Sequence, residues 1–270
     1  MTNDSGFGVL LAWLLDRREL GAEEPAERAK VTANEVRTVL AGGAPGEELL
    51  RRIAPVMEFR TVDLFILAGP AVPDDLAPLD GAAEEWAPYI VMDGVHLPAA
   101  ARRELLRLIR SLPQEQRLSV FVPKPLATLA DRGGAVIRML QYRNLSWTGM
   151  QRALTVATPT LLSASTYSSI GSGRKELTPR LVTDFAAVLG INAPELAALT
   201  GVHLPEVPPP PRPEAVDAAA LLWETRRLSA AQARHVSELA RSMRGESANG
   251  YLADLPGRTA SSATNSRAAE

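Results

Sequence analysis

The sequence predicts an all-α fold that contains one helical bundle twice, with an additional amphipathic helix after each copy. Three observations carry this prediction. Apolar residues recur at the i, i+3, i+4, i+7 spacing of amphipathic helices. Capping residues and glycines mark where helices begin and end. Two long segments of the chain also align with each other, which indicates an internal duplication.

Composition places the chain among ordinary globular proteins. Its 270 residues are 46% hydrophobic and 22% charged, with a net charge of −2, and this length is typical of about two domains. The absence of cysteine excludes disulfides and thiolate metal sites and suits a reducing compartment, so we expect a cytoplasmic protein. The apolar run 9–15 is too short to span a membrane and lacks a cleavage site of the secretory type.

The two copies of the bundle cover approximately 9–69 and 135–201. They align when Gly42 is placed over Gly173 and Gly69 over Gly201. Other matched pairs are Arg18 and Arg143, Leu20 and Leu145, Leu50 and Val182, Met57 and Leu189, Phe59 and Ile191, and Leu64 and Leu196. Because the shared positions are mostly apolar, we expect both copies to have the same core.

The alignment continues into the helices expected over 97–112 and 228–243, which match without gaps, Arg110 over Arg241 included. The stripe of the first helix is Leu105, Leu108, Ile109 and Leu112, and that of the second is Val236, Leu239, Ala240 and Met243. We expect both helices to pack in a core shared by the two halves, with Leu108 and Leu239 at matched buried positions.

In the first copy, an apolar helix is followed by a second helix from about Glu23, a turn at Lys30 and Val31, and a third helix that Thr32 caps. Gly42 should end the third helix in a left-handed conformation. In the second copy, about six extra residues, 157–162, precede the third helix. The next helix should begin at Thr178-Pro179, and the last at Asn192, with Glu195 completing a capping box.

Pro-rich and polar segments separate these units. The run VPPPPRPE from Val207 predicts a stiff spacer, and the Ser- and Ala-rich residues from Glu246 onward predict disorder. The predicted division is a first bundle over 1–69, a linker with an amphipathic helix over 70–113, a connection over 114–134, a second bundle over 135–203, a Pro-rich linker with amphipathic helices over 204–245, and a disordered tail over 246–270.

The order of helices and turns in the first copy, with apolar residues at Ala26, Ala29, Val31, Val36 and Val39, resembles the Cro/CI-type helix-turn-helix regulators, often called the XRE family. The second copy resembles the same family at Leu145-Ser146, at Met150 and over 163–174, and departs from it by the extra residues. The resemblance implies a bacterial-type transcription regulator that binds double-stranded DNA, its third helix lying in the major groove.

A recognition helix presents short polar side chains to base edges, while basic groups contact phosphates. The DNA-contacting residues expected in the second copy are Ser163, Ser165, Thr166, Ser168, Ser169, Arg174, Lys175 and Arg152. Those expected in the first copy are Thr32, Asn34 and Arg37, where Asn34 would read adenine and Arg37 guanine.

Segment charge favours the second copy as the main contact. Residues 133–203 hold 6 Lys and Arg against 3 Asp and Glu, whereas residues 1–70 hold 8 against 11. Glu23, Glu24 and Glu27 lie on the second helix of the first copy, near the expected path of a phosphate. Because affinity for DNA depends on neutralising phosphates, we expect the first copy to be held back from DNA.

Catalysis is not expected. The histidines His96, His203 and His235 are far apart in the sequence, and no catalytic or phosphate-loop motif surrounds them. No cofactor and no metal is expected. Two functions remain open. One is a DNA-binding regulator whose halves form a pseudo-dimer within one chain, and the other is an interaction module that docks a partner protein or a second copy through 97–112 and 228–243.

Overall fold

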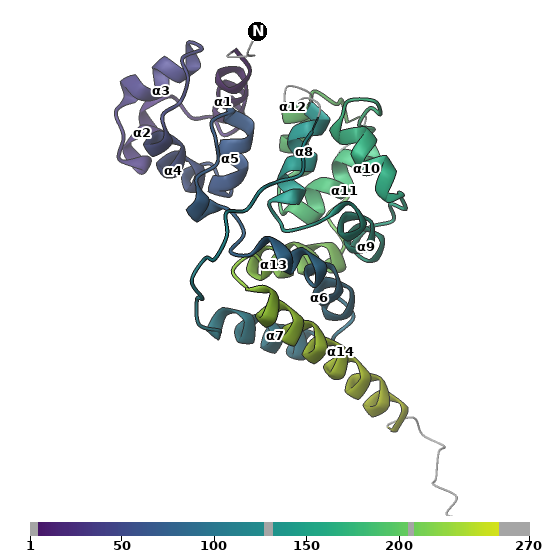
Figure 1. Cartoon of the computed structure of the whole chain (residues 1–270). Helices are drawn as coiled ribbons and strands as arrows, with labels where there is room; N and C mark the ends of the chain where they lie inside the picture. The colour runs from purple at the N-terminus through teal and green to yellow at the C-terminus, as the bar shows by residue number, and fades with distance from the viewer. Residues whose placement is uncertain (1–4, 127–131, 205–207, 254–270) are drawn as a thin grey trace, which may run out of the picture.

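Helices form the regular structure of the chain in a computed structural model, which describes residues 5–126, 132–204 and 208–253 (Figure 1). Since no strand occurs among these residues, the all-α prediction is confirmed for the described chain. The first half comprises α1 (Ser5–Arg17), α2 (Glu23–Ala29), α3 (Ala33–Leu40), α4 (Glu47–Val56), α5 (Thr61–Ala68), the 3-10 helices η1 (Asp74–Leu76) and η2 (Gly81–Glu85), α6 (Ala87–Gly94) and α7 (Ala99–Ser111). The second comprises α8 (Arg132–Gln141), α9 (Trp147–Ala157), α10 (Ala164–Gly171), α11 (Pro179–Leu189), α12 (Ala193–Thr200), α13 (Pro213–Thr225) and α14 (Ala230–Ala253).

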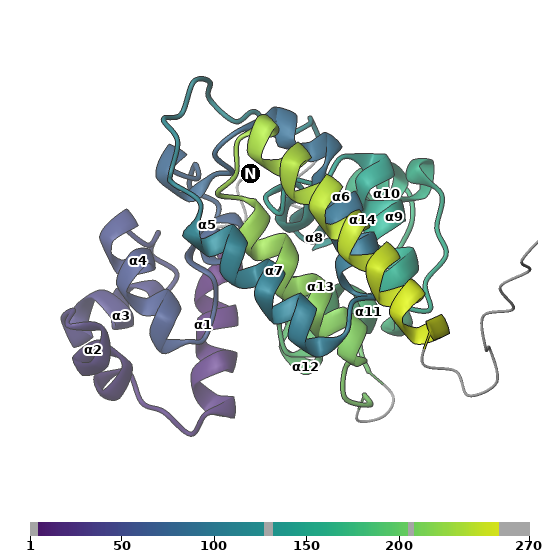
Figure 2. The same ribbon diagram turned by 90° about the horizontal axis from the view of Figure 1, so that it is seen from below.

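Helices α1 to α5 form a first bundle and α8 to α12 a second, and the pairs α6/α7 and α13/α14 pack together below them (Figures 1 and 2). The first bundle has its own core, which includes Leu14, Val36 and Leu50. The core of the second bundle is continuous with the four helices below it. The helices α6, α7, α13 and α14 form the base of the molecule. The second bundle is therefore joined to this base by a common core, whereas the core of the first bundle includes no residue of these four helices.

Two glycines allow the third helix of each bundle to approach the first helix closely. A Cβ atom at Gly8 of α1 would lie 2.3 Å from the Val39 carbonyl oxygen of α3, and one at Gly133 of α8 would lie 2.7 Å from the Ile170 carbonyl oxygen of α10. Both distances are too short for any other residue without a backbone shift. The sequence alignment places Gly8 over Gly133 and Val39 over Ile170, so the same close approach occurs at matched positions.

Several predicted helix ends are confirmed. Thr32 accepts a hydrogen bond from the Glu35 amide and Glu35 bonds back to Thr32, which makes a capping box. Gly42 follows α3 with a φ of 95°, and Thr178 caps α11 by accepting from the Leu181 amide. The left-handed conformation at Gly42 lets the chain turn away from the helix end.

The capping box predicted at Asn192 and Glu195 is wrong. Asn192 does precede α12, but its side chain makes no capping hydrogen bond. The Glu195 carboxylate instead accepts a hydrogen bond of 2.6 Å from Arg18 of the first bundle. A tertiary ion pair has replaced the local cap at this helix end.

The extra residues of the second copy form an extended connection between α9 and the Ser163 N-cap of α10. Thr160 in this connection donates a hydrogen bond to the buried carboxylate of Asp184 in α11. Arg180, also of α11, donates to the Pro159 carbonyl oxygen at 2.9 Å. The insertion is therefore anchored on α11, whereas in the first copy the Lys30 C-cap of α2 lies only two residues before the Thr32 cap of α3.

Two further predictions, one about the C-terminal residues and one about the helices over 97–112 and 228–243, need correction. Helix α14 continues to Ala253, so disorder does not begin at Glu246, and the remaining residues 254–270 lie outside the described part. Leu108 and Leu239 are half-buried rather than core residues. The buried positions are Leu105 and Ile109 of α7 and Val236 and Ala240 of α14, because these face the packed neighbours while Leu108 and Leu239 lie at the edge of each stripe.

The two bundles meet through α1 and α5 on one side and α8 and α12 on the other. Arg18 pairs with Glu195 at 2.6 Å, and Arg143 pairs with Asp63 at 2.6 and 2.8 Å. The sequence alignment places Arg18 over Arg143 and Asp63 over Glu195, so each pair is the reciprocal of the other. The same arginines donate to the carbonyl oxygens of two further matched residues: Arg18 to Met57 at 3.1 Å and Arg143 to Leu189 at 3.2 Å.

A second reciprocal arrangement occurs in the base. Arg110 of α7 pairs with Glu224 of α13 at 2.9 Å, and Arg241 of α14 lies 3.8 Å from Asp93 of α6. The alignment that places Arg110 over Arg241 also places Asp93 over Glu224. Each half therefore supplies the arginine of one pair and the carboxylate of the other.

Residues with positive φ also fall at matched positions. All those among the described residues, except Lys30, form pairs under the alignment. The pairs are Glu19 and Asn144, Gly42 and Gly173, Glu58 and Gly190, and Gly69 and Gly201. Because a left-handed residue redirects the chain after a helix, the two bundles change direction at the same points.

Candidate nucleic-acid interface

Helix α10 presents a polar surface anchored by two buried side chains. Tyr167 and Ile170 point into the core, and the Tyr167 ring packs against Phe185 with ring centroids 6.2 Å apart. Burial raises the pKa of the Tyr167 hydroxyl above its usual range, and that hydroxyl has no hydrogen-bond partner among the described residues. The remaining side chains of the helix are left at or near the surface.

The predicted contact residues of α10 lie together on that surface. Ser163 and Ser165 are exposed, and Thr166, Ser168 and Ser169 are partly exposed. The Ser163 hydroxyl lies 2.9 Å from that of Ser165 and 3.0 Å from that of Thr166. Ser163 makes no side-chain cap to α10, and the Thr166 amide donates to the Ser163 carbonyl oxygen at 2.9 Å. Hydroxyls at one helix end can contact both bases and phosphates.

Two basic residues follow α10 directly. Arg174 and Lys175 are exposed, and both of their amides donate to the Ser169 carbonyl oxygen, at 2.9 and 3.1 Å. This bonding holds the backbone beyond Gly173 against the end of the helix. The Arg174 guanidinium contacts the Ser172 hydroxyl at 2.9 Å, and neither side chain forms an ion pair among the described residues.

Arg152, the remaining candidate of the second copy, contacts a different part of the molecule. It extends from α9 over the ring of Tyr89 in α6, with the guanidinium carbon 4.7 Å from the ring centroid. The side chain is exposed, so it combines a cation–π contact with access to solvent. The sequence predicted Arg152 as a DNA-contacting residue but not its contact with Tyr89, because Tyr89 lies in the segment that separates the copies.

The candidate residues of the first copy are exposed on α3 and its cap. Thr32 and Asn34 lie at the start of the helix. Arg37 pairs with Glu23 of α2, and this pairing lowers the pKa of the Glu23 carboxyl. Arg52 of α4 donates to the Lys30 carbonyl oxygen at 2.9 Å, which fixes the turn between α2 and α3. Before Arg37 can contact a base, it must therefore leave a carboxylate.

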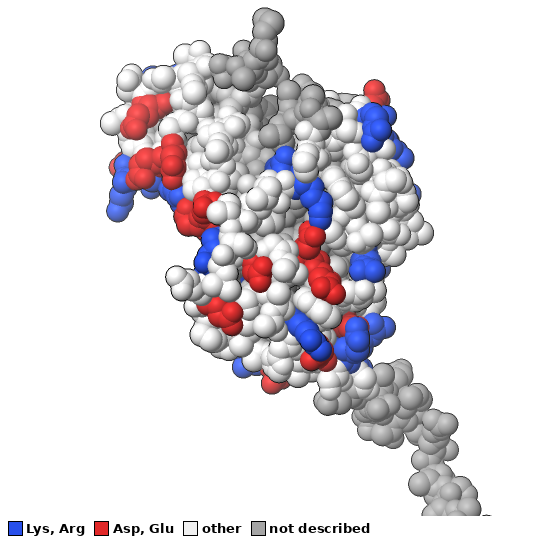
Figure 3. Space-filling model, in the orientation of Figure 1, with Lys and Arg blue, Asp and Glu red and all other residues white. Residues whose placement is uncertain are grey.

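The surface charge differs between the two bundles. Helices α3 and α10 lie on outer sides of the pair of bundles, with α1, α5, α8 and α12 between them (Figure 1). In the face shown in Figure 3, acidic groups gather over the first bundle and basic groups along the outer edge of the second. This distribution follows the segment charges and makes the surface around α10 the better match for a polyanion.

The predicted partner surface on 97–112 and 228–243 is used within the chain. Leu105, Ile109 and Val236 are fully buried among α6, α7, α13 and α14. The outward positions carry charged or polar side chains such as Arg103 and His235. These helices therefore keep little of their apolar stripe for another protein.

Comparisons with known protein families, with curated proteins and with solved structures found no match. In the described residues, no helix has both the length and the apolar character needed to cross a membrane. The same part of the chain contains no cluster of three or more His, Asp or Glu side chains arranged to hold a metal ion.

Proposed function

We propose that this protein binds double-stranded DNA as a transcription regulator of the Cro/CI type, with its two helix-turn-helix units acting as a pseudo-dimer within one chain. In this proposal the protein acts by binding rather than by catalysis. Helix α10 and the basic residues after it make the main contact, and α3 makes the weaker one.

The observation that carries the proposal is the reciprocal pairing of Arg18 with Glu195 and of Arg143 with Asp63. In a two-fold dimer every interface contact occurs twice with the partners exchanged. Helix-turn-helix dimers use such symmetry to present two recognition helices to two half-sites of DNA. The matched contacts, with α3 and α10 on outer sides, support the same use of two units here.

The assignment of α10 as the main contact rests on charge and accessibility. Arg174 and Lys175 are exposed and free of carboxylates, whereas Arg37 is held by Glu23. An arginine that must first break an ion pair binds a phosphate or a base less favourably. Small hydroxyl side chains on α10 both donate and accept, so we expect only a modest preference among base sequences.

The test is selection of bound sequences from random duplex DNA, followed by fluorescence anisotropy at several salt concentrations. The double variant Arg174→Glu, Lys175→Glu should lose most of its affinity, and the slope of log K against log salt should fall by about two units. Selected sequences should contain two half-sites whose centres lie about one helical turn apart.

The matched control is Arg103→Glu, Arg107→Glu, which makes the same charge change at exposed positions of α7. This variant should bind almost as the parent does. If both double variants bind equally well, or if the parent binds no duplex at low salt, the proposed interface is wrong.

A further inference from the structure

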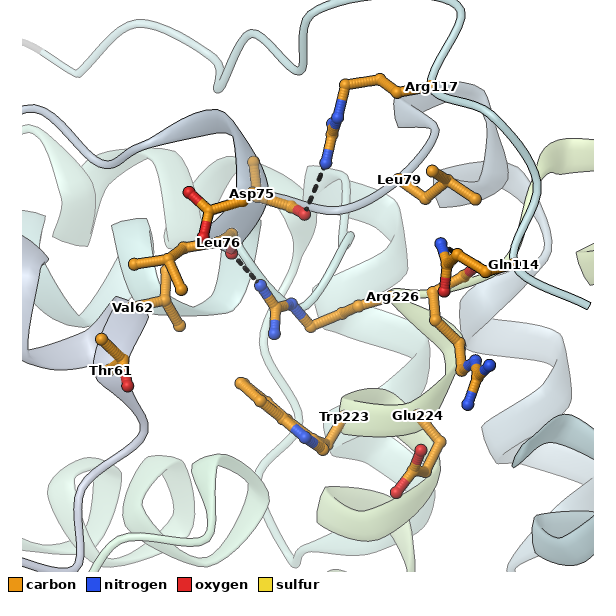
Figure 4. Close-up of a pocket in the computed structure, with 12 residues that line it drawn as sticks. Thr61, Val62, Asp75, Leu76, Leu79, Gln114, Arg117, Trp223, Glu224 and Arg226 are labelled. Carbon is orange, nitrogen blue, oxygen red and sulfur yellow. Dashed lines mark hydrogen bonds between the residues drawn. The ribbon is translucent and has the colours of Figure 1, made fainter. Parts of the chain in front are cut away.

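A cavity of about 370 Å³ lies where the first bundle meets the base of the molecule (Figure 4). It is bounded by the start of α5, the linker through η1, the segment after α7, and the C-terminal end of α13. Its volume is within the range of about 300–1,000 Å³ found for sites that bind small molecules. None of the residues proposed to contact DNA lines it.

Arg226 crosses the middle of this cavity. Its guanidinium reaches from the end of α13 toward the Leu76 carbonyl oxygen, with Trp223 beneath it (Figure 4). The residue is only 9% exposed, yet its Nε atom has no hydrogen-bond partner among the described residues. A buried donor without an acceptor is unfavourable, so an anion that enters the cavity beside this guanidinium would compensate a charge that the protein leaves incompletely bonded.

Positive charge is concentrated around the same point. The guanidinium carbons of Arg60, Arg143 and Arg226 lie 4.3, 5.0 and 4.2 Å from the centroid of Trp223. Of these three cations, Arg143 has the buried Asp63 as its partner. Burial, reinforced by the neighbouring guanidinium groups, lowers the pKa of Arg226 to about 9. The cavity thus holds a cation whose charge the protein does not balance.

The carboxylates that line the cavity are committed to other arginines. Asp75 pairs with Arg51 at 2.8 Å, and Glu224 pairs with Arg110 at 2.9 Å. Arg117 donates to backbone carbonyl oxygens of the linker, including that of Ala77 at 3.1 Å. These contacts fix the walls of the cavity and leave Arg226 without an acidic partner.

We propose that this cavity binds a small organic oxyanion, either a carboxylate or a phosphate monoester, whose oxygens accept from the guanidinium of Arg226. Guanidinium groups bind such oxygens strongly because the donors are charged and fixed in a plane. The indole edge of Trp223 and the side chains of Val62 and Leu79 supply apolar surface for the rest of the molecule. The site does not depend on the proposed DNA binding.

The test is isothermal titration calorimetry of the full chain with phenyl phosphate, benzoate and benzyl alcohol at constant ionic strength. At least one of the two anions should bind, and the neutral alcohol should not. Binding of phenyl phosphate alone assigns a phosphate ester, and binding of benzoate alone assigns a carboxylate. Failure of both anions, or equal binding of the alcohol, overturns the proposal.

Two variants locate the binding. Arg226→Gln should weaken binding of the anion by about tenfold or more, the effect of losing a hydrogen bond from a charged donor. Gln114→Phe, at an exposed position that lines the cavity, should weaken binding by filling part of the entrance while Arg226 itself is unchanged. Gln116→Phe, at an exposed position outside the cavity, is the matched control and should bind as the parent does.

Circular dichroism melting checks that each variant is folded. Should Arg226→Gln not fold, the comparison of Gln114→Phe with Gln116→Phe decides the question. Parent-like binding by Gln114→Phe, or by a folded Arg226→Gln, places the ligand elsewhere and refutes the proposal.

Discussion

The two bundles join through the same kind of ion pair in different surroundings. Arg143 and Asp63 have side chains that are 1% and 0% exposed, whereas Arg18 and Glu195 are 20% and 13% exposed. Arg143 also packs against the ring of Trp223 in α13, with the guanidinium carbon 5.0 Å from the ring centroid, and this contact adds to its burial. Ion pairs at matched sequence positions can therefore have the same geometry and contribute differently to stability.

The hydrophobic cores of the two bundles also differ in what they pack against. The buried residues of the first bundle's main core all come from that bundle, with Ile191 and Leu199 of the second packed against them, whereas the second bundle shares its core with α6, α7, α13 and α14. Charge differs too, since Arg37 faces a carboxylate in the first copy and Arg174 does not in the second. Together these differences make the second bundle the more firmly packed of the two and, in the proposed function, the better candidate for the main DNA contact.

The largest expected effect is a difference in stability loss between variants of the two ion pairs. Asp63→Ala leaves Arg143 buried without a partner and should lower the free energy of unfolding by about 3–5 kcal/mol. Glu195→Ala leaves Arg18 able to reach water and should cost about 1 kcal/mol. Urea unfolding followed by circular dichroism measures both. Equal losses would show that burial does not distinguish the pairs.

A control for this prediction removes both buried charges. The double variant Asp63→Leu, Arg143→Met replaces the pair with apolar side chains of similar size. Because a buried ion pair gives little net stabilisation over apolar packing, it should recover most of the loss caused by Asp63→Ala. A double variant as unstable as Asp63→Ala would show that the carboxylate has another role.

A smaller effect is the pH dependence of stability that Asp184, in the second bundle, contributes. Burial raises the pKa of Asp184, outweighing the hydrogen bond from Thr160. The folded state then binds the proton more tightly than the unfolded state, so this group's contribution is full below its ordinary pKa and is lost as the pH rises through the raised value. The variant Asp184→Asn should lack this pH-dependent contribution to the free energy of unfolding. The parent should lose stability relative to the variant across that interval.

Urea unfolding of parent and variant at a series of pH values tests this prediction. The difference between them isolates Asp184, since other carboxyl groups with raised pKa, such as Glu195 and Asp217, are present in both proteins. In the first bundle the matched position is the exposed Arg52, which offers no corresponding effect. A difference that does not change with pH would contradict the assignment.

The smallest effect probes the first bundle and rests on the proposed DNA binding. Glu23→Gln removes a negative charge and releases Arg37, so it should strengthen binding at low salt by about threefold, an advantage that fades as salt screens the charges. Glu24→Gln changes the same charge on α2 and should strengthen binding less. Fluorescence anisotropy at two salt concentrations measures both, and identical curves would show that the pair with Glu23 does not restrain Arg37.

Local signals predicted many of the elements. The turn at Lys30, the cap at Thr32, the glycine end at Gly42 and the start at Thr178 depend on residues within a few positions of each other, and all occur as predicted. The signal at Asn192 failed because Glu195 forms a stronger contact with a residue far away in the sequence. The close approach at Gly8 and Gly133 was missed, although the alignment places these two glycines at the same position.

For the candidate DNA surface, the sequence predicted which side chains are exposed but not which residues they contact. Exposed hydroxyls on α10 and the basic residues after it follow from the helix pattern, because a helix face is fixed by its spacing. The pairing of Arg37 with Glu23 and the contact of Arg152 with Tyr89 each join different elements. Sequence spacing contains no information about such neighbours.

By itself, the sequence determined the helical class, most helix ends and the internal match of the two copies, since these depend on local spacing and capping. Only the tertiary structure decided which of two matched arginines is buried, where the apolar stripes of α7 and α14 pack, and that Nε of Arg226 is enclosed beside Trp223 without an acceptor. The physical reason is that burial and charge pairing depend on all the elements that surround a side chain, and those elements come from distant parts of the chain.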